Sequence, residues 1–113
     1  MDLKTPLCDR LDIGLPIIQA PMAGAVGPAL AAAVSNAGGL GMLVLWRADA
    51  ATMRSQIREI RALTTRPFGV NLNLEFPQEE RLALCLEECV PVISFFWRDP
   101  SALVARAKSE GAS

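Results

Sequence analysis

The sequence has 113 residues, of which 51% are hydrophobic and 20% are charged, and its formal net charge is −1. This apolar content excludes an intrinsically disordered chain, and the length suits one ordinary domain. Eleven basic residues against twelve acidic ones leave no positive excess, so the charge predicts no binding to nucleic acid or to an anionic membrane surface.

The region 13–46 contains no charged residue, but prolines and glycines interrupt it, so it does not suit one membrane-spanning helix. Its first part, residues 16–22, predicts a short buried strand followed by a glycine-containing loop. Residues 28–37 predict a helix, with a proline suited to the first turn and two glycines after the last turn. The apolar residues 40–46 then predict a second strand.

A second helix is expected after Asp49, which can cap its N-terminus, because apolar residues at helical spacing extend to Leu63 or Thr64. Residues 67–74 predict a third strand, in which apolar side chains alternate with glycine, asparagine and glutamate. Pro77 opens a third helix with acidic residues in its first turn, as the helix dipole prefers.

Residues 91–97 predict a fourth strand, and a fourth helix is expected from Asp99-Pro100 to a point near Gly111. The chain is therefore expected to form four consecutive βα units. Such an alternation predicts an α/β fold with a parallel sheet, either an open sheet or the N-terminal half of a TIM (βα)8 barrel. An open four-stranded sheet would be complete at this length, whereas a barrel of roughly 250 residues would be less than half present.

Two asparagines, Asn71 and Asn73, share the polar face of the third predicted strand near its C-terminal end. Both faces of a parallel sheet are normally covered, so these amides need hydrogen-bond partners. A ligand is one such partner, because an amide offers a donor and an acceptor that suit the edge of a heterocycle. The backbone of neighbouring loops is the other, and the pattern does not choose between them.

The loop after the first predicted strand, in the sequence QAPMAG, suits a flat aromatic ring. Pro21 removes an amide donor and fixes the backbone, Met22 offers a polarisable side chain, and Gly24 permits a close backbone approach. The same residues also suit a plain turn from strand to helix. Near the end of the fourth predicted strand, the aromatic residues 95–97 are candidates for a substrate pocket or for core packing.

Three motifs in order resemble the N-terminal part of the nitronate monooxygenases, formerly called 2-nitropropane dioxygenases. They are the segments LPIIQAPMAG (15–24), SNAGGLG (35–41) and PFGVNL (67–72). The resemblance covers essentially the whole chain and favours the barrel over the open sheet. It implies a partial FMN-binding (βα)8 barrel over residues 1–113 that ends before an expected fifth strand, from a cytoplasmic flavoprotein that oxidises alkyl nitronates with molecular oxygen.

The same resemblance implies that Ala20, Pro21 and Met22 line the flavin and that Asn71 hydrogen-bonds it. In that family the catalytic histidine and the glycine-rich loops that hold the FMN phosphate lie further along the chain, and these 113 residues contain neither histidine nor tyrosine. An imidazole base, a histidine metal site and a phenol acid are therefore excluded within them. We expect the chain by itself to lack full nitronate oxidation and to hold FMN weakly.

Two alternative functions remain open from the sequence. A related flavin barrel, of the enoyl-acyl-carrier-protein reductase type, shares the strand-loop architecture and would use a nicotinamide donor. A non-catalytic half-barrel is the other alternative, because four βα units leave two strand edges unpaired and one face uncovered, which promotes self-association or pairing with a second half-barrel.

The cysteines are Cys8, Cys85 and Cys89. An odd number at irregular spacing, without an evident secretory leader, predicts reduced thiols in a cytoplasmic protein. Cys85 and Cys89 are spaced four residues apart on a predicted helix and could hold a metal. Their position on or beside the apolar stripe of that helix favours small buried side chains without a metal.

Overall fold

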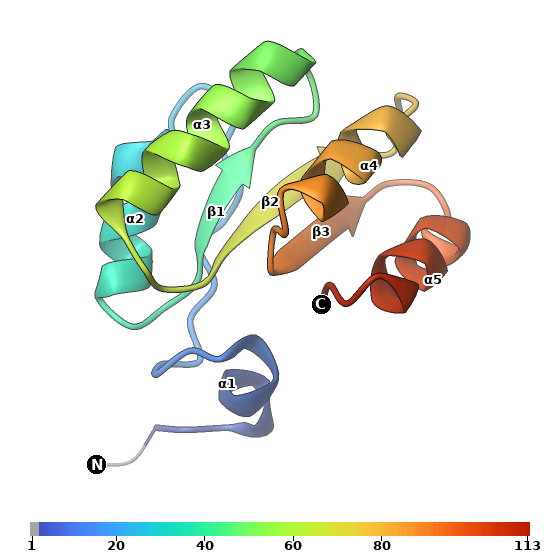
Figure 1. Cartoon of the computed structure of the whole chain (residues 1–113). Coiled ribbons are helices and arrows are strands. Elements are labelled where there is room, and N and C mark those ends of the chain that lie inside the picture. The colour runs from blue at the N-terminus through green and yellow to red at the C-terminus, as the bar shows by residue number, and fades with distance from the viewer. Residues whose placement is uncertain (1–2) are drawn as a thin grey trace.

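The computed structural model describes residues 3–113, which form an α/β structure (Figure 1). In chain order the elements of this described part are α1 (Pro6–Leu11), α2 (Pro28–Asn36), β1 (Gly41–Val44), α3 (Ala50–Leu63), β2 (Phe68–Asn73), α4 (Glu79–Glu87), β3 (Val92–Phe96) and α5 (Ser101–Ser109). Within it, three parallel strands form one sheet in the order β1-β2-β3. The predicted parallel α/β architecture is therefore confirmed.

The strand expected over residues 16–22 is reduced to one parallel bridge between Ile18 and Leu40. The backbone N–H of Gln19 still donates to the carbonyl oxygen of Leu40, at 2.9 Å. The backbone N–H of Met42, however, donates to the side-chain Oε1 of Gln19 at 3.2 Å. Because a side-chain oxygen accepts this bond, strand pairing stops after one bridge, and the predicted extent of this strand is wrong.

One face of the sheet carries the main hydrophobic core, and α2, α3, α4 and α5 cover it. Buried side chains from the strands include Leu43, Val70, Leu72 and Ile93. The helix predicted after Asp49 is confirmed as α3, and the Asp49 carboxylate accepts a hydrogen bond from the backbone N–H of Thr52 at 2.8 Å. Its apolar stripe contributes fully buried residues to this core: Met53, Ile57 and Ile60.

Helix α2 lies against the start of β1 at very short range. A β-carbon at position 41 would overlap the carbonyl oxygen of Ala31, so only glycine permits this approach. The hydroxyl of Ser35 accepts from the backbone N–H of Gly41 at 3.0 Å and donates to the carbonyl oxygen of Pro67 at 2.8 Å. This buried serine therefore ties α2 to the first residues of two neighbouring strands.

The other face of the sheet, here called the inner face, is covered at its N-terminal end by α1. This helix was not predicted, although Pro6 occupies its first turn, where proline is favoured. It lies below the N-terminal ends of the strands, apart from the other helices (Figure 1). The buried cluster between α1 and the sheet consists of Cys8, Ile13, Leu40, Met42 and Val92.

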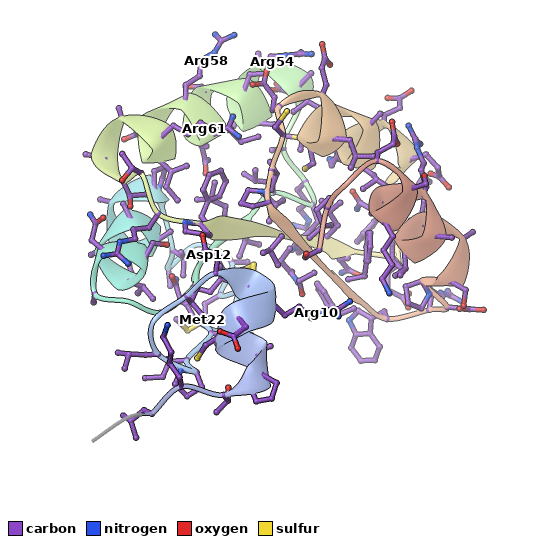
Figure 2. All side chains as sticks on the ribbon, turned by 60° about the horizontal axis from the view of Figure 1, so that its bottom comes forward. Arg10, Asp12, Met22, Arg54, Arg58 and Arg61 are labelled. Atoms are coloured by element: carbon purple, nitrogen blue, oxygen red, sulfur yellow. The ribbon has the colours of Figure 1, made fainter. Side chains whose placement is uncertain are left out.

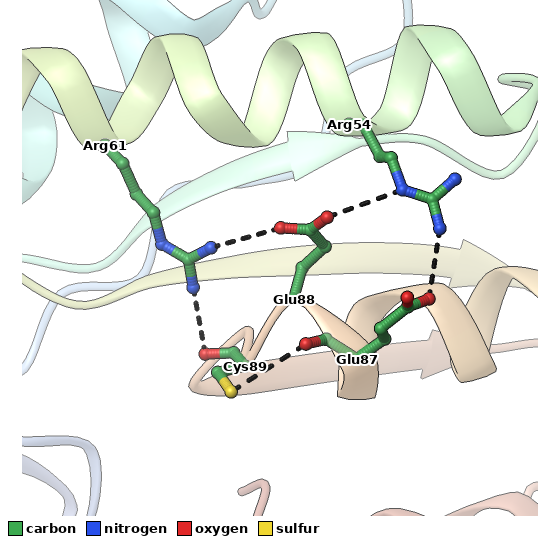
Figure 3. A network of polar contacts seen from close by, with 5 residues as sticks. All are labelled: Arg54, Arg61, Glu87, Glu88 and Cys89. Carbon is green, nitrogen blue, oxygen red and sulfur yellow. Dashed lines mark hydrogen bonds and ion pairs between the residues drawn. The ribbon is translucent and has the colours of Figure 1, made fainter.

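Arginines of α3 connect this helix to the C-terminal end of α4 (Figure 3). Arg54 is 3.0 Å from Glu87 and 3.4 Å from Glu88, and Arg61 is 3.8 Å from Glu88. Arg58 instead points away from the sheet (Figure 2). Since these ion pairs are partly exposed, each contributes only about 0–1 kcal/mol to stability, and they mainly fix how the two helices lie together.

The two cysteines predicted on one helix lie in different environments. Helix α4 ends at Glu87, so Cys89 follows it in a left-handed conformation with φ of 57°. Cys89 is exposed, and its carbonyl oxygen accepts a hydrogen bond from Arg61 at 3.1 Å. Cys85 is buried, and burial raises the pKa of its thiol to about 12. The expectation that both are buried is therefore wrong for Cys89, because the helix ends before reaching it.

No helix within residues 3–113 combines the length and the apolar character that crossing a membrane would require. In the same part of the chain, no group of three or more cysteine, aspartate or glutamate side chains is placed to hold a metal ion.

Candidate functional site

A cavity of about 330 Å³ lies on the inner face of the sheet, at the C-terminal ends of the strands. Its described lining combines the loop before α2 with residues from all the strands of the sheet: Pro21, Ala23, Val44, Trp46, Asn71, Ser94 and Phe96. In parallel α/β folds, ligands bind at this end of the strands, where the loops converge.

Strand register brings the central lining residues together. Val44 pairs with Asn71, and Asn71 pairs with Ser94, so the three residues lie side by side across the sheet. Side chains alternate between the two faces of a strand, so Phe96, two residues beyond Ser94, faces the same way. The site thus combines residues far apart in the sequence.

Asn71 occupies the centre of this arrangement and is 2% exposed. Its Nδ2 donates a hydrogen bond to the Ser94 hydroxyl oxygen, at 3.1 Å. Among residues 3–113, the Asn71 side chain makes no other hydrogen bond. Its Oδ1 is therefore available to accept a hydrogen bond from a ligand. The sequence left open a ligand or the backbone of a loop as the partner of this amide. The structure shows a side chain, that of Ser94, and no bond from this amide to a loop backbone among the described residues.

Asn73 has a different role from Asn71, although both are buried. The side-chain Oδ1 of Asn73 accepts from the backbone N–H of Glu75 at 2.9 Å, which stabilises the turn after β2. Its carbonyl oxygen accepts from Nε2 of the buried Gln78, also at 2.9 Å, and the same amide donates to the carbonyl oxygen of Trp46 at 3.1 Å. Asn73 and Gln78 therefore hold the loops that surround the cavity.

The loop residues suggested by the sequence are only partly brought to the cavity. Pro21 lines it, together with Ala23. Ala20 and Met22 are exposed and are not among the described lining residues, and the side chain of Met22 is 46% exposed. The carbonyl oxygen of Met22 accepts from the backbone N–H of Ala25 at 3.1 Å, which closes a turn over residues 22–25.

An aromatic stack forms one wall of the cavity. The rings of Trp46 and Phe76 are 5.4 Å apart and inclined by 12°, and the Arg47 guanidinium lies 4.6 Å from the centre of the Trp46 ring. A neighbouring cavity of about 300 Å³ shares Trp46 and Ala23 with the first and is also lined by Arg47. Trp46, with Ala23 and Val44, therefore lines both an uncharged cavity and one whose lining contains a cation.

Beyond Phe96, the backbone takes an unusual path at the rim of the cavity. Trp97 and Arg98 have positive φ values of 62° and 52°, a region that costs free energy for residues other than glycine. Trp97 is 63% exposed, and Arg98 forms an ion pair with Glu75 at 3.2 Å. Strained backbone of this kind clusters at ligand sites, and here it follows the end of a strand directly.

Among the described lining residues of the inner-face cavity none is ionisable, so the cavity can bind and orient a ligand but cannot supply a proton-transfer group from its own walls. Apolar walls with an amide and a hydroxyl on one side suit a flat heterocycle. A phosphate is favoured by cationic partners, which the described lining does not offer. The residues present therefore fit a flavin ring better than a complete flavin nucleotide.

A larger cavity of about 560 Å³ lies between the N-terminal turns of α3 and α4 and includes Asp49, Glu79, Glu80 and Arg81 in its lining. Two of its polar side chains already bond to the surrounding backbone. Asp49 caps α3, and the Arg81 guanidinium donates to the carbonyl oxygen of Ala48 at 2.9 Å. The inner-face cavity is therefore the better candidate, since it contains an amide oxygen still free to accept.

Ser94 and Trp46 are lining residues that the sequence analysis did not single out. A signal for Ser94 was present. Side chains alternate between the two faces of a strand, so Ser94 shares a face with Phe96 in the fourth predicted strand. Its position beside Asn71 depends on strand register, which the sequence of one strand does not contain. Trp46 could not be identified as a lining residue without knowing where β1 ends and how the loop after it folds.

Comparison with known proteins gives consistent results. The sequence model described as nitronate monooxygenase matches residues 4–83. The chain is 51% identical over 81 residues to the nitronate monooxygenase of Paraburkholderia phytofirmans, which covers 72% of this chain and 22% of that protein. It is 35% identical over 113 residues to an octahydro-indene-carboxyl-CoA dehydrogenase of Mycobacterium tuberculosis, covering 99% of this chain and 32% of that protein.

Among solved structures, FabK from Thermotoga maritima is similar over 97% of this chain and 36% of its own length, with 39% identity and a TM-score of 0.91. The chain thus spans about a third or less of the curated relatives described above. The structural neighbours are TIM-barrel enzymes of which this chain matches about a third, and a barrel is one of the two folds that the succession of βα units predicts.

Proposed function

The chain belongs to the nitronate monooxygenase family, and on that premise we propose that it forms the N-terminal part of the flavin site of an FMN-dependent oxidoreductase that oxidises alkyl nitronates with molecular oxygen. The observation that carries the proposal is the buried Asn71 amide, whose oxygen is free to accept a hydrogen bond at the C-terminal end of the parallel strands. A flavin ring offers a flat apolar surface and a polar edge, which match the lining of this cavity.

When bound, FMN would supply the electron-transfer chemistry, and the residues of this chain would bind and orient its ring. Pro21 and Val44 exclude water from the ring with apolar surface, and Trp46 adds an aromatic wall that Phe76 supports. Asn71 accepts a hydrogen bond from the polar edge of the ring. In the proposal, Ala20 and Met22 are closer to the rim than to the ring, because they are not among the described lining residues of the cavity.

The proposal leaves proton transfer and phosphate binding to residues outside the cavity lining. The chain has no histidine, so an imidazole base is not provided by these 113 residues. Arg47 is a cation close to the lining, 4.6 Å from the centre of the Trp46 ring, and it lines the neighbouring cavity together with Gly24. We therefore expect FMN to bind weakly to this chain and nitronate turnover to be incomplete.

We also propose that the sheet edges of this chain pair with other strands, either from a second copy or from a second half-barrel. At one edge, Ile17 and Ile18 are exposed apolar residues. At the other, Ser113 of the same chain already bonds to the edge of β3 as a parallel strand would: the N–H of Ile93 donates to the carbonyl oxygen of Ser113 at 2.7 Å, and the N–H of Ser113 donates to the carbonyl oxygen of Pro91 at 3.0 Å. In the proposal, a further strand pairs with the rest of this edge. Solution mass at several concentrations tests this pairing, and a monomer throughout would contradict self-association.

A flavin-dependent enoyl-acyl-carrier-protein reductase is the second candidate, and the structural similarity to FabK favours it. The two candidates share the flavin site but differ in the electron donor. A nitronate donates electrons itself, whereas a reductase takes them from a nicotinamide cofactor.

The experiment that tests the proposal is a titration of the purified chain with FMN, followed by the visible absorption of the flavin. We expect a saturable change in the visible band, and an unchanged spectrum at high FMN concentration would contradict the flavin site. The loaded protein is then mixed without oxygen with either an alkyl nitronate or NADH. A spectral change with the nitronate supports the proposal, and a change with NADH alone favours the reductase.

A further inference from the structure

Ser94 is placed to control the orientation of the Asn71 amide. It lies on β3 directly opposite Asn71 in the parallel register, it is partly buried, and both residues line the inner-face cavity. The amide nitrogen of Asn71 donates to its hydroxyl oxygen at 3.1 Å. A hydroxyl can also donate, but in this structure it accepts, so the nitrogen of the amide points toward β3 and the oxygen is left for the cavity.

No other lining side chain can replace Ser94 in this role. Among the described residues of the cavity wall, only Trp46 and Ser94 carry a polar side-chain atom besides Asn71 itself, and the indole of tryptophan can donate but not accept. The Asn73 side-chain oxygen is engaged with the backbone N–H of Glu75. Ser94 is therefore the acceptor within this wall that the amide nitrogen of Asn71 can use.

The consequence concerns which ligand groups the site accepts. An asparagine amide presents a donor or an acceptor according to which way it is turned, and the two orientations have nearly the same shape. If the nitrogen is satisfied by Ser94, the site presents an acceptor and selects a ligand that donates an N–H. If that bond is lost, a buried donor is left unpaired, and either orientation of the amide becomes possible.

We infer that Ser94 is a positioning residue that holds Asn71 as a hydrogen-bond acceptor for a ring N–H of the ligand. The inference rests on the proposed function for the identity of that ligand, FMN. Ser94 acts through Asn71, so its contribution to FMN affinity exists only while the Asn71 amide is present.

The test measures the dissociation constant of FMN for the wild-type chain, Ser94→Ala, Asn71→Ala and the double variant. Ser94→Ala is expected to weaken binding by about three- to tenfold, the effect of one lost hydrogen bond. The double variant is expected to bind no more weakly than Asn71→Ala. Ser94→Thr keeps the hydroxyl and is expected to restore both the affinity and the shape of the visible band of bound FMN.

A second measurement needs no FMN. In ¹⁵N-labelled protein, the side-chain NH2 signals of Asn71 are expected to be protected from solvent exchange in the wild type and in Ser94→Thr, and to lose this protection in Ser94→Ala. Circular dichroism and unfolding of each variant control for loss of the fold.

Two results would overturn the inference. Wild-type protein that binds FMN with an affinity unchanged by Ser94→Ala would show that Ser94 does not position the amide. An additive double variant would show that Ser94 contacts the ligand directly instead of acting through Asn71. If the wild type fails to bind FMN while the NH2 protection depends on Ser94, the proposed function fails and the orientation of the amide stands.

Discussion

The two ends of the inner face are built from the same strands but have opposite character. At the N-terminal end, Leu40, Met42 and Val92 are apolar, and residues of α1 bury them. At the C-terminal end, the strand residues on this face include Asn71 and Ser94, which line a cavity. Under the proposed function, this difference corresponds to stability at one end and ligand binding at the other, as in (βα)8 barrels generally.

The first prediction tests the N-terminal end by removing apolar volume. Leu40 is fully buried against α1, so Leu40→Ala is expected to lower the free energy of unfolding by about 2–5 kcal/mol. Val44→Ala, in the half-buried wall of the cavity, is the matched control and is expected to cost less. Denaturant unfolding of both variants measures this difference, and equal losses would contradict a division between the two ends.

The second prediction compares the same chemical change near the two ends of the strands, with the first serine on α2 and the second on the inner face. Ser35→Ala leaves the buried N–H of Gly41 and the carbonyl oxygen of Pro67 without their partner, so it is expected to lower the free energy of unfolding by about 1–3 kcal/mol. Ser94→Ala is expected to affect FMN affinity more than stability. If the serine near the strand starts proved neutral in unfolding experiments, the structural role assigned to that end would be wrong.

The third prediction uses thiols as probes of how closed the N-terminal end is. Cys8 is buried in the cluster under α1, Cys85 is buried in the main core, and Cys89 is exposed. The raised pKa of Cys85, about 12, further disfavours its reactive thiolate. A chromogenic disulfide reagent is expected to react rapidly with one thiol of the folded chain, and with none in Cys89→Ser. Rapid reaction of Cys8 would show that α1 does not seal its end of the sheet.

The smallest expected effect concerns the pH dependence of a cap at the C-terminal end. Hydrogen bonds from Thr52 lower the pKa of Asp49 in the folded state below its ordinary value of 3.8. The ionised cap therefore stabilises the protein above the ordinary aspartate pKa, and this stabilisation disappears as the pH falls through the lower, folded pKa. Asp49→Ala is expected to be less stable than the wild type at neutral pH, by a difference that shrinks in acid.

Asp49→Asn is the matched control for that prediction, since asparagine also caps helices but carries no charge. It is expected to keep most of the stability at neutral pH and to remove this part of the acid dependence. FMN affinity is expected to be unchanged in both variants, because Asp49 faces solvent outside the inner-face cavity. If the difference in stability between the wild type and Asp49→Ala grew as the pH fell, the role of Asp49 as an ionised helix cap would be contradicted.

Much of the fold was predictable because local patterns determine it. The helices expected after Pro28 and Asp49 form where proline, capping and apolar spacing predict them. The length of the first strand was not predictable, because the N–H of Met42 donates to the side-chain oxygen of Gln19 instead of to a main-chain carbonyl oxygen. Helix α1 is short, and its buried residues find their partners only in the folded sheet.

The candidate site was predictable only in part, for a related reason. Asn71 could be singled out from the alternation within its own strand. Its partner Ser94 depends on the register between two strands, and the turn that exposes Met22 depends on backbone hydrogen bonds within the loop. Local sequence therefore identified the central residue of the cavity but not the contacts that orient it.

The central claim is that Asn71 at the C-terminal end of the inner face binds the flavin ring. The most direct test is the FMN dissociation constant of Asn71→Ala beside that of Asn73→Asp, which keeps the acceptor for the Glu75 N–H. We predict at least about tenfold weaker binding for Asn71→Ala, from the loss of a buried hydrogen bond, and nearly wild-type affinity for Asn73→Asp. Equal affinities of the two variants and the wild type would contradict the account.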